Sequence, residues 1–173
     1  MDMELVLATQ TTHFKSLENL ARQIWTEHYC AIIGQQQVDY MLDKFQSADA
    51  IAEQSQQGRA YYLLMGAADN PATAAGYLAY DLADSDSDSG KPQLFLSKLY
   101  IHSDFRGQGL AKQALQAVID QHPNRDILLT VNKKNHIAIN FYLAQGFIKN
   151  REVVADIGNG YVMDDYEMLK TTN

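Results

Sequence analysis

Hydrophobic and polar positions follow two periods along the chain, and each period predicts one type of element. Residues 4–8 alternate as a strand does. After Thr11 and Thr12, apolar residues at helical spacing predict a helix ending near residues 28–30; they are Phe14, Leu17, Leu20, Ala21, Ile24 and Trp25. Helical spacing recurs over residues 35–45 and 48–56. The first third of the chain is therefore predicted to be mostly helical.

Two strands are predicted next, over residues 60–65 and 74–82, because Tyr and Leu suit a pleated surface. A turn at Asn70 and Pro71 would join them as an antiparallel hairpin. Residues 84–90 then read DSDSDSG. An EF-hand loop needs Gly at its sixth position and Glu at its twelfth, whereas here Gly90 is seventh and Phe95 twelfth. This run predicts a solvated loop, and we expect no metal site.

Residues 93–102 form the most apolar strand, which predicts a central strand buried on both faces. A helix over 108–120 and a strand over 127–131 follow, so this strand pair is predicted to be parallel through a helical crossover. A helix over 135–145 would place Ile137, Ala138, Phe141 and Tyr142 on one side, and strands over 147–154 and 161–169 end the chain. The order predicts a mixed α/β fold with helices packed on a central sheet.

Length and composition favour one globular domain, residues 1–173, because 173 residues leave no room for a second full domain. Hydrophobic residues make up 46% and charged residues 20% of the chain, so a hydrophobic core can form without covalent or metal cross-links. The net charge of −7 opposes nucleic-acid binding. It favours cationic partners, or serves only to keep the protein soluble.

The single cysteine, Cys30, cannot form an internal disulfide, and a lone cysteine in a helical pattern is expected in the core rather than as a nucleophile. This composition suits a reducing cytoplasm. The first ten residues lack the pattern of a signal peptide, and no stretch of about 18 apolar residues occurs. We therefore expect a cytoplasmic protein that does not bind or span a membrane.

The segment LYIHSDFRGQGLA, residues 99–111, places two glycines where an apolar strand becomes a helix. Unpaired N–H groups at a helix start, the helix dipole and the close approach that glycine permits together suit a phosphate group. Arg106 can add a charged fork. A tight strand-to-helix corner also explains glycines on backbone grounds alone. The spacing fits neither a P-loop nor a dinucleotide-binding fingerprint.

The pattern Q/R-x-x-G-x-G/A after an apolar strand resembles the acetyl-CoA loop of the GNAT superfamily of N-acyltransferases. Downstream, NHIAINFYLAQGF resembles the second signature of that superfamily, through Asn135, Ala138, Tyr142, Gly146 and Phe147. The ending GYVMDDYEMLK resembles a bacterial branch that contains spermidine/spermine-type N-acetyltransferases. The resemblance implies about seven strands in a mixed, mostly antiparallel sheet, about four flanking helices, and a splayed parallel strand pair with a cleft between its strands.

The resemblance also implies the donor site for acetyl-CoA. Residues matching the pyrophosphate loop are Arg106, Gly107, Gln108, Gly109, Leu110, Ala111 and Lys112. Leu99, Tyr100 and Ile101 would pair with the pantetheine arm, and Asn135 would contact the cofactor. Tyr142 would lie near the sulfur and give a proton to the leaving thiolate. A backbone N–H near Leu99 would face the developing oxyanion.

No general base is assigned, because this sequence has Ser97 and Lys98 where many members of the superfamily carry a carboxylate. Water, His28, Tyr29 or the pair Asp164 and Asp165 could accept the proton of the amine. The residues expected to line the acceptor pocket are Trp25, His28, Tyr29 and Tyr40, which could instead pack the first two helices. Aromatic and acidic groups suit a polyamine.

The function predicted is transfer of an acetyl group from acetyl-CoA to a primary amine of a small molecule, by direct attack in a ternary complex. Two alternatives stay open: an acyl-CoA-binding sensor without turnover, and a protein or peptide N-terminal acetyltransferase. A scaffold that binds no cofactor is a third class. Dimers are the commonest homo-oligomers, so a homodimer is the assembly to test.

Overall fold

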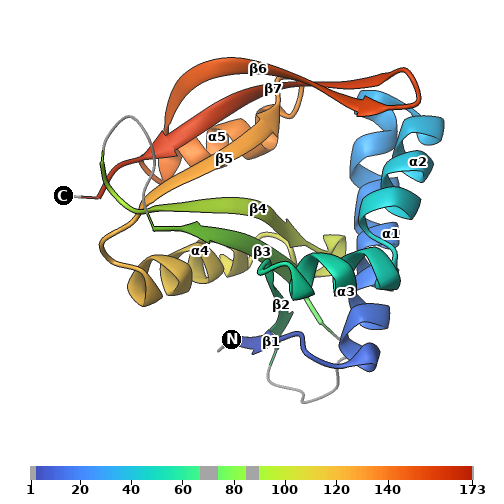
Figure 1. Ribbon diagram of the computed structural model, residues 1–173, viewed down its shortest axis with the longest axis horizontal. Helices are drawn as coiled ribbons and strands as arrows, with labels where there is room; N and C mark the ends of the chain where they lie inside the picture. Colours follow the sequence, from blue (N-terminus) through green and yellow to red (C-terminus); the bar gives the residue numbers. More distant parts are fainter. Residues whose placement is uncertain (1–2, 67–73, 85–89, 173) are drawn as a thin grey trace. The chain divides into compact units, whose positions relative to one another are not determined.

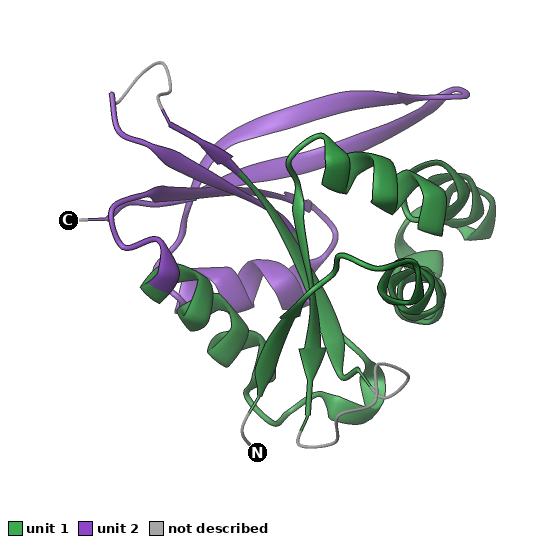
Figure 2. Cartoon of the chain, turned by 60° about the horizontal axis from the view of Figure 1, so that its bottom comes forward, with its two compact units in different colours: residues 1–81, 98–120 green, residues 82–97, 121–173 purple. Residues whose placement is uncertain are grey.

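The computed structural model describes residues 3–66, 74–84 and 90–172. The predicted turn at Asn70 and Pro71, and most of the DSDSDSG run, lie outside the described residues. The chain divides into two compact units: residues 1–81 with 98–120, called unit 1, and residues 82–97 with 121–173, called unit 2 (Figure 2). That residues 1–173 act as one domain stays a prediction.

The described part of the chain contains seven strands of one sheet, in the order β1-β2-β3-β4-β5-β7-β6 (Figure 1). The strands are β1 (Glu4–Leu7), β2 (Ala60–Met65), β3 (Gly76–Ala83), β4 (Gln93–Ile101), β5 (Asp126–Asn132), β6 (Ile148–Gly158) and β7 (Tyr161–Lys170). The helices are α1 (Thr11–Ile33), α2 (Gln35–Phe45), α3 (Ala48–Gln56), α4 (Leu110–Gln121) and α5 (His136–Ala144), with a 3-10 turn, η2 (Ser103–Phe105). The mixed α/β fold is therefore confirmed, with five α-helices among the described residues rather than about four.

Three helices and the first strands make up most of unit 1. Helix α1 buries the predicted stripe, which is Leu17, Leu20, Ala21, Ile24 and Trp25, and it runs past the predicted end to Ile33. Helix α3 begins at Ser47, whose Oγ accepts a hydrogen bond from the N–H of Ala50 at 3.2 Å, as an N-cap should. Strands β2 and β3 pair antiparallel from Ala60–Tyr80 to Leu64–Gly76, which confirms the predicted hairpin partners.

Unit 2 is built on the strands β5, β7 and β6, which pair antiparallel in that order. A parallel ladder joins β4 to β5 through Gln93–Asp126, Leu94–Ile127 and Phe95–Leu128. Strand β6 is the last strand of the sheet, and its pairing with β7 shifts register between Lys149 and Arg151 and again between Asp156 and Gly158. The predicted parallel crossover is confirmed.

Two burial predictions are wrong. Strand β4 is not buried on both faces, because among its residues only Leu94 and Leu96 are buried and the others are half-buried. In α5 the buried residues are Ile139 and Tyr142, whereas Ile137 is 77% exposed. An apolar sequence shows that a segment can be buried, but the neighbouring elements decide which side is covered.

Candidate functional site

The loop between η2 and α4 has the backbone geometry that requires glycine at two positions. Gly107 and Gly109 have φ of +75° and +74°, in the left-handed region that L side chains rarely adopt. Space does not explain them, since a Cβ at Gly107 would meet nothing within 4 Å. Because both glycines lie outside the helix, α4 begins at Leu110 rather than at the predicted residue 108.

The amide groups of this loop are available for an anion. Among the described residues, no backbone hydrogen bond takes its N–H from residues 107–112, and the first α4 bond runs from Gln113 to the Gly109 oxygen at 3.0 Å. Residues 106–109 are exposed, and the first turn of α4 contains no acidic residue. Exposed N–H donors at the positive end of a helix dipole fit a pyrophosphate.

The Arg106 side chain is hydrogen-bonded to the strand that leads into this loop. Its Nε donates to the carbonyl oxygen of Ile101 at 3.1 Å, so the guanidinium is held beside the end of β4 while the side chain stays exposed. Lys112, in the first turn of α4, is also exposed. Two cations at the same loop reinforce its fit to a polyphosphate group.

The end of β4 lies against β3 at very close range. A Cβ on Gly76 would collide with the carbonyl oxygen of Tyr100 and approach Ile101, and the N–H of His102 donates to the Ala75 oxygen at 2.8 Å. Leu99, Tyr100 and Ile101 are half-buried. The strand segment that was predicted to run along the cofactor is thus fixed in place by its neighbour in unit 1.

An aromatic cluster, which we define as Trp25, Tyr29, Tyr77 and Tyr100, brings α1 to the sheet of unit 1. The Tyr100 ring lies 5.7 Å from that of Trp25, 6.1 Å from that of Tyr29 and 5.4 Å from that of Tyr77. The hydroxyls of Tyr29 and Tyr100 are 3.3 Å apart, and the Trp25 Nε1 donates to the Tyr77 Oη at 2.9 Å. All four side chains therefore carry a polar atom at hydrogen-bonding distance from another member.

The four residues predicted to line the acceptor pocket are distributed unevenly. Trp25 and Tyr29 belong to the aromatic cluster, and the His28 ring packs edge-on to Tyr29 at 4.8 Å. Tyr40 lies on α2, where its hydroxyl accepts a hydrogen bond from the Lys44 Nζ at 2.9 Å. The structure therefore brings three of the four together with Tyr100.

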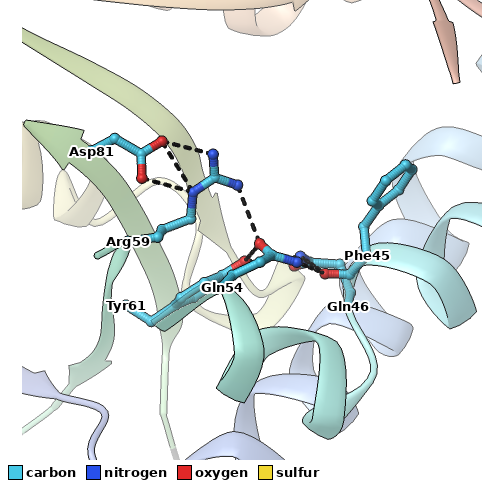
Figure 3. Close-up of polar contacts among 6 residues, drawn as sticks. All are labelled: Phe45, Gln46, Gln54, Arg59, Tyr61 and Asp81. Carbon is cyan, nitrogen blue, oxygen red and sulfur yellow. Dashed lines mark hydrogen bonds and ion pairs between the residues drawn. The ribbon is translucent and has the colours of Figure 1, made fainter. Parts of the chain in front are cut away.

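A buried polar network continues from the aromatic cluster, and the sequence analysis missed it. The Tyr77 hydroxyl donates to the Gln46 Oε1 at 2.8 Å, and the Gln46 Nε2 donates to the Tyr61 Oη at 3.2 Å. The Tyr61 hydroxyl donates in turn to the Gln54 Oε1 at 2.8 Å. Figure 3 shows the part of this network formed by Gln46, Gln54 and Tyr61.

The far end of this network is charged. Arg59 donates a hydrogen bond from Nη1 to the Gln54 Oε1 at 3.1 Å (Figure 3). Its Nε and Nη2 both donate to the Asp81 carboxylate, at 3.1 and 2.7 Å respectively. Desolvation lowers the pKa of nearby Lys98 to about 7, with Arg59 adding to the effect and Asp81 opposing it. Isolated Gln, Arg and Asp residues carry no periodic signal, so only their contacts in the fold could reveal this network.

The second predicted signature lies in unit 2. Asn135 is buried and caps α5, because its Oδ1 accepts a hydrogen bond from the Ala138 N–H at 3.2 Å. Tyr142 is 8% exposed and its ring contacts those of Phe141 and Phe147 at 5.1 and 5.3 Å. Asn135 thus acts as a helix cap and Tyr142 as a buried aromatic residue in unit 2, whereas residues 106–112 belong to unit 1.

Unit 2 also holds the two neighbouring carboxylates of β7. Asp164 is exposed and pairs with the Lys133 Nζ at 2.6 Å, and the same nitrogen contacts Glu152 at 2.8 Å. Asp165 is buried, and burial together with the charge of Asp164 raises its pKa to about 6, while Lys133 and Thr130 act in the opposite direction. The pair that the sequence treats alike therefore has two different environments.

Two searches of the described residues concern other kinds of site. No group of three or more His, Cys, Asp or Glu side chains among them could hold a metal ion. No described helix is both long enough and apolar enough to cross a membrane.

Comparison with known proteins identifies a family. The model described as the acetyltransferase (GNAT) family matches residues 16–147, most of the chain. A search of curated proteins found no significantly similar sequence.

Solved structures share the fold at low sequence identity. The PaiA N-acetyltransferase of Thermoplasma acidophilum, in complex with coenzyme A, is 17% identical, with 99% of each chain covered and a TM-score of 0.71. An acetyltransferase of Thermus thermophilus is 21% identical, with 98% of each chain covered and a TM-score of 0.66. Arabidopsis thaliana Naa50, bound to the bisubstrate analogue CoA-Ac-MVNAL, is 19% identical, with 99% of each chain covered and a TM-score of 0.63.

Proposed function

Because this chain belongs to the acetyltransferase (GNAT) family and is an acetyl-CoA-dependent N-acetyltransferase, we propose that its acceptor is a primary amine of a small molecule, with polyamines favoured. Binding of the acetyl donor is supported by the exposed loop of Gly107 and Gly109, whose amide groups make no backbone hydrogen bond. The acidic net charge of −7 and the aromatic cluster support a cationic acceptor.

Acetyl-CoA would be held by residues that differ in what they offer. Residues 106–112 supply amide N–H groups and two cations for the pyrophosphate, and Leu99, Tyr100 and Ile101 supply strand backbone for the pantetheine arm. Asn135 would border the cofactor while it caps α5. When bound, acetyl-CoA supplies a thioester whose carbonyl carbon accepts the amine nitrogen.

Two groups of this chain would then act on charge and protons. A backbone N–H near Leu99 would donate a hydrogen bond to the oxygen on which negative charge develops. The Tyr142 hydroxyl would give a proton to the departing sulfur. No covalent bond to the protein is needed, because a neutral amine attacks a thioester directly.

The acceptor would be held by aromatic faces and carboxylates. His28 and Tyr29 would offer ring faces to an ammonium group, the buried Trp25 would support them from behind, and Tyr40 would extend this lining. The ending GYVMDDYEMLK supports the spermidine/spermine-type branch in particular. We propose that residues 1–173 work as one acyl-CoA N-acyltransferase domain, in the cytoplasm.

The likeness to Naa50 bound to a peptide-bearing analogue favours a second candidate, acetylation of a peptide N-terminus. An amine panel distinguishes the two. Purified protein is incubated with acetyl-CoA and with spermidine, an aminoglycoside, an amino acid or a short peptide, and free thiol is measured. We expect spermidine to give the highest kcat/KM. A higher kcat/KM with the peptide would replace the polyamine with the second candidate.

A protein that binds acetyl-CoA without turnover is the remaining alternative. Calorimetry with acetyl-CoA alone measures the donor site independently of the acceptor. For Tyr142→Phe we expect unchanged affinity for acetyl-CoA with turnover lowered at least about tenfold. Tight binding of acetyl-CoA with no thiol release from any member of the panel would identify a sensor, and no binding at all would indicate a scaffold.

A further inference from the structure

Asp165 has a buried carboxyl group, and one oxygen of that group lacks a hydrogen-bond partner. The residue is 8% exposed, and its Oδ1 is the only buried side-chain nitrogen or oxygen among the described residues that lacks a hydrogen-bond partner. Asp126, the other buried aspartate, differs: its Oδ1 accepts hydrogen bonds from the Thr172 N–H at 2.8 Å and the Thr172 hydroxyl at 3.2 Å. Buried aspartates of this fold can therefore be satisfied, and the Oδ1 of Asp165 is an exception.

An orphaned carboxylate oxygen is costly, so it calls for an explanation. Burial and the neighbouring charge of Asp164 raise the pKa of Asp165 to about 6, against the effects of Lys133 and of a hydrogen bond with Thr130. At neutral pH this carboxyl group is still largely charged, yet it remains close to taking up a proton. These properties suit a group that meets a cation or a proton during function.

The charged groups around Asp165 are engaged elsewhere. Lys133, from the turn after β5, contacts Asp164 and Glu152. Glu167, two residues along β7, is held by Arg151 of β6 at 2.8 Å. In the ladders, the residues opposite Asp165 are uncharged, namely Asn132 on β5 and Val153 on β6. Lys133 and Arg151 thus have carboxylate partners other than the Oδ1 of Asp165.

Asp165 also lies close to the second signature within unit 2. Its ladder partner, Asn132, is the last residue of β5, and the Asn135 N–H donates to the Asn132 oxygen at 2.9 Å. Asp165 therefore lies beside the turn that starts the second signature, at the strand end that leads to Asn135. Asp164 differs in both respects, because its side chain is 56% exposed and paired.

We propose that the Oδ1 of Asp165 binds the ammonium group of the acceptor and takes one proton from it. This inference rests on the proposed function and adds the group that receives the amine proton, for which β4 offers only Ser97 and Lys98. Losing one proton to Oδ1 leaves the acceptor as a neutral amine. Its nitrogen then bonds to the acetyl carbon as the carbon–sulfur bond breaks. Tyr142 gives its hydroxyl proton to the sulfur and regains a proton from the attacking nitrogen, and Asp165 returns its proton to water.

Carboxyl titration tests the binding step without catalysis. In protein labelled with ¹³C at the aspartate carboxyl groups, we expect one aspartate with a pKa near 6, absent in Asp165→Asn and present in Asp84→Asn, which removes an exposed aspartate paired with Arg125. Adding spermidine, without acetyl-CoA, should lower this pKa by at least about one unit, because an opposite charge favours the carboxylate. A pKa that does not move at saturating spermidine would overturn the proposal.

Kinetics test the proton transfer. In wild-type protein, kcat/KM for spermidine should fall below about pH 6, as protonated Asp165 cannot take a proton. Asp165→Asn should lower kcat/KM about a hundredfold and remove this acid limb, with unchanged affinity for acetyl-CoA showing that the variant is folded. Asp84→Asn should retain the wild-type rate within about threefold, as expected for an exposed ion pair.

The two proposals fail in different ways. If wild-type protein acetylates no amine, the proposed function fails and the role of Asp165 fails with it. If wild-type protein acetylates spermidine while Asp165→Asn keeps both the rate and the acid limb, only the role of Asp165 is wrong. A lowered rate with an unchanged acid limb would also overturn it, because a purely structural role would leave the pH profile in place.

Discussion

The carbonyl oxygen of Tyr100 lies where a Cβ of Gly76 would have to stand. Strand β3 can therefore approach the end of β4 only because residue 76 has no side chain. The approach supports the same segment of β4 that carries the Tyr100 ring of the aromatic cluster and the Ile101 oxygen that holds Arg106.

Gly76→Ala is expected to destabilise the protein by about 3 kcal/mol, because the obstacle is backbone and cannot turn away. The measurement is the free energy of unfolding in urea. Gly160→Ala is the matched control: Gly160 has a φ of +77° but nothing within 4 Å of an added Cβ, so its cost should be only about 1–2 kcal/mol. Equal losses in the two variants would contradict the steric explanation.

Arg106→Ala should weaken binding of acetyl-CoA about tenfold or more, since a charge-assisted contact to a phosphate is lost. Calorimetry at two salt concentrations measures the effect, which should shrink at high salt. Lys15→Ala, on the exposed side of α1, removes an equal charge and should leave the affinity unchanged. If Arg106→Ala binds acetyl-CoA with wild-type affinity, Arg106 does not contribute to the donor site.

Tyr77→Phe should cost about 2–4 kcal/mol, because it leaves both the Trp25 Nε1 and the Gln46 Oε1 without this buried partner. Trp25→Phe removes only one of the two bonds. A double-mutant cycle between the two positions, measured by urea unfolding, should give a coupling energy of about 1 kcal/mol. Strict additivity would mean that the bond between Trp25 and Tyr77 contributes nothing measurable.

Lys98→Met should be more stable than wild type at pH 7. Burial lowers the pKa of Lys98 to about 7, so between about pH 7 and 10 the native state binds fewer protons than the unfolded chain, whose lysines titrate normally. Wild-type stability should therefore rise with pH across this range, and the rise should be smaller in Lys98→Met. Lys15→Met controls for loss of charge, and an identical rise in Lys98→Met would contradict the prediction.

Asp165→Asn should stabilise the fold at pH 7 by up to about 3 kcal/mol. Here the native pKa, about 6, lies above the ordinary value of 3.8, so the native state binds the proton more tightly. Wild-type stability is thus expected to fall as pH rises from about 4 to 6. The advantage of the variant should disappear below about pH 4. Thermal unfolding across this range checks it, and a constant advantage at every pH would argue for repacking instead.

Local patterns predicted the elements closely. Ala48–Gln56, Gln35–Phe45 and Ala60–Met65 have the bounds that spacing predicts, because period and cap residues act within a few positions. Burial was predicted less well. The exposure of Ile137 depends on which side of α5 its neighbours cover, and those neighbours come from distant segments.

The donor loop could be predicted from sequence because its chemistry is contiguous, with Gly107 and Gly109 in one turn. The buried polar network could not. Gln46, Tyr61 and Tyr77 meet only through the fold, over separations of 15 to 31 residues. In the same way, the letters DD do not distinguish Asp164 from Asp165, since an orphaned oxygen depends on which groups surround it.

The place of β6 at the end of the strand order of the described residues has a consequence for how the protein behaves when concentrated. An outer strand of eleven residues is a template on which another chain could assemble by strand addition. Its two register shifts interrupt the regular edge, and Lys149, Arg151, Glu152 and Asp156 spread charge along it. Fibrous aggregation through this edge is thereby disfavoured, and removing those charges together should make the protein precipitate at concentrations that the wild type tolerates.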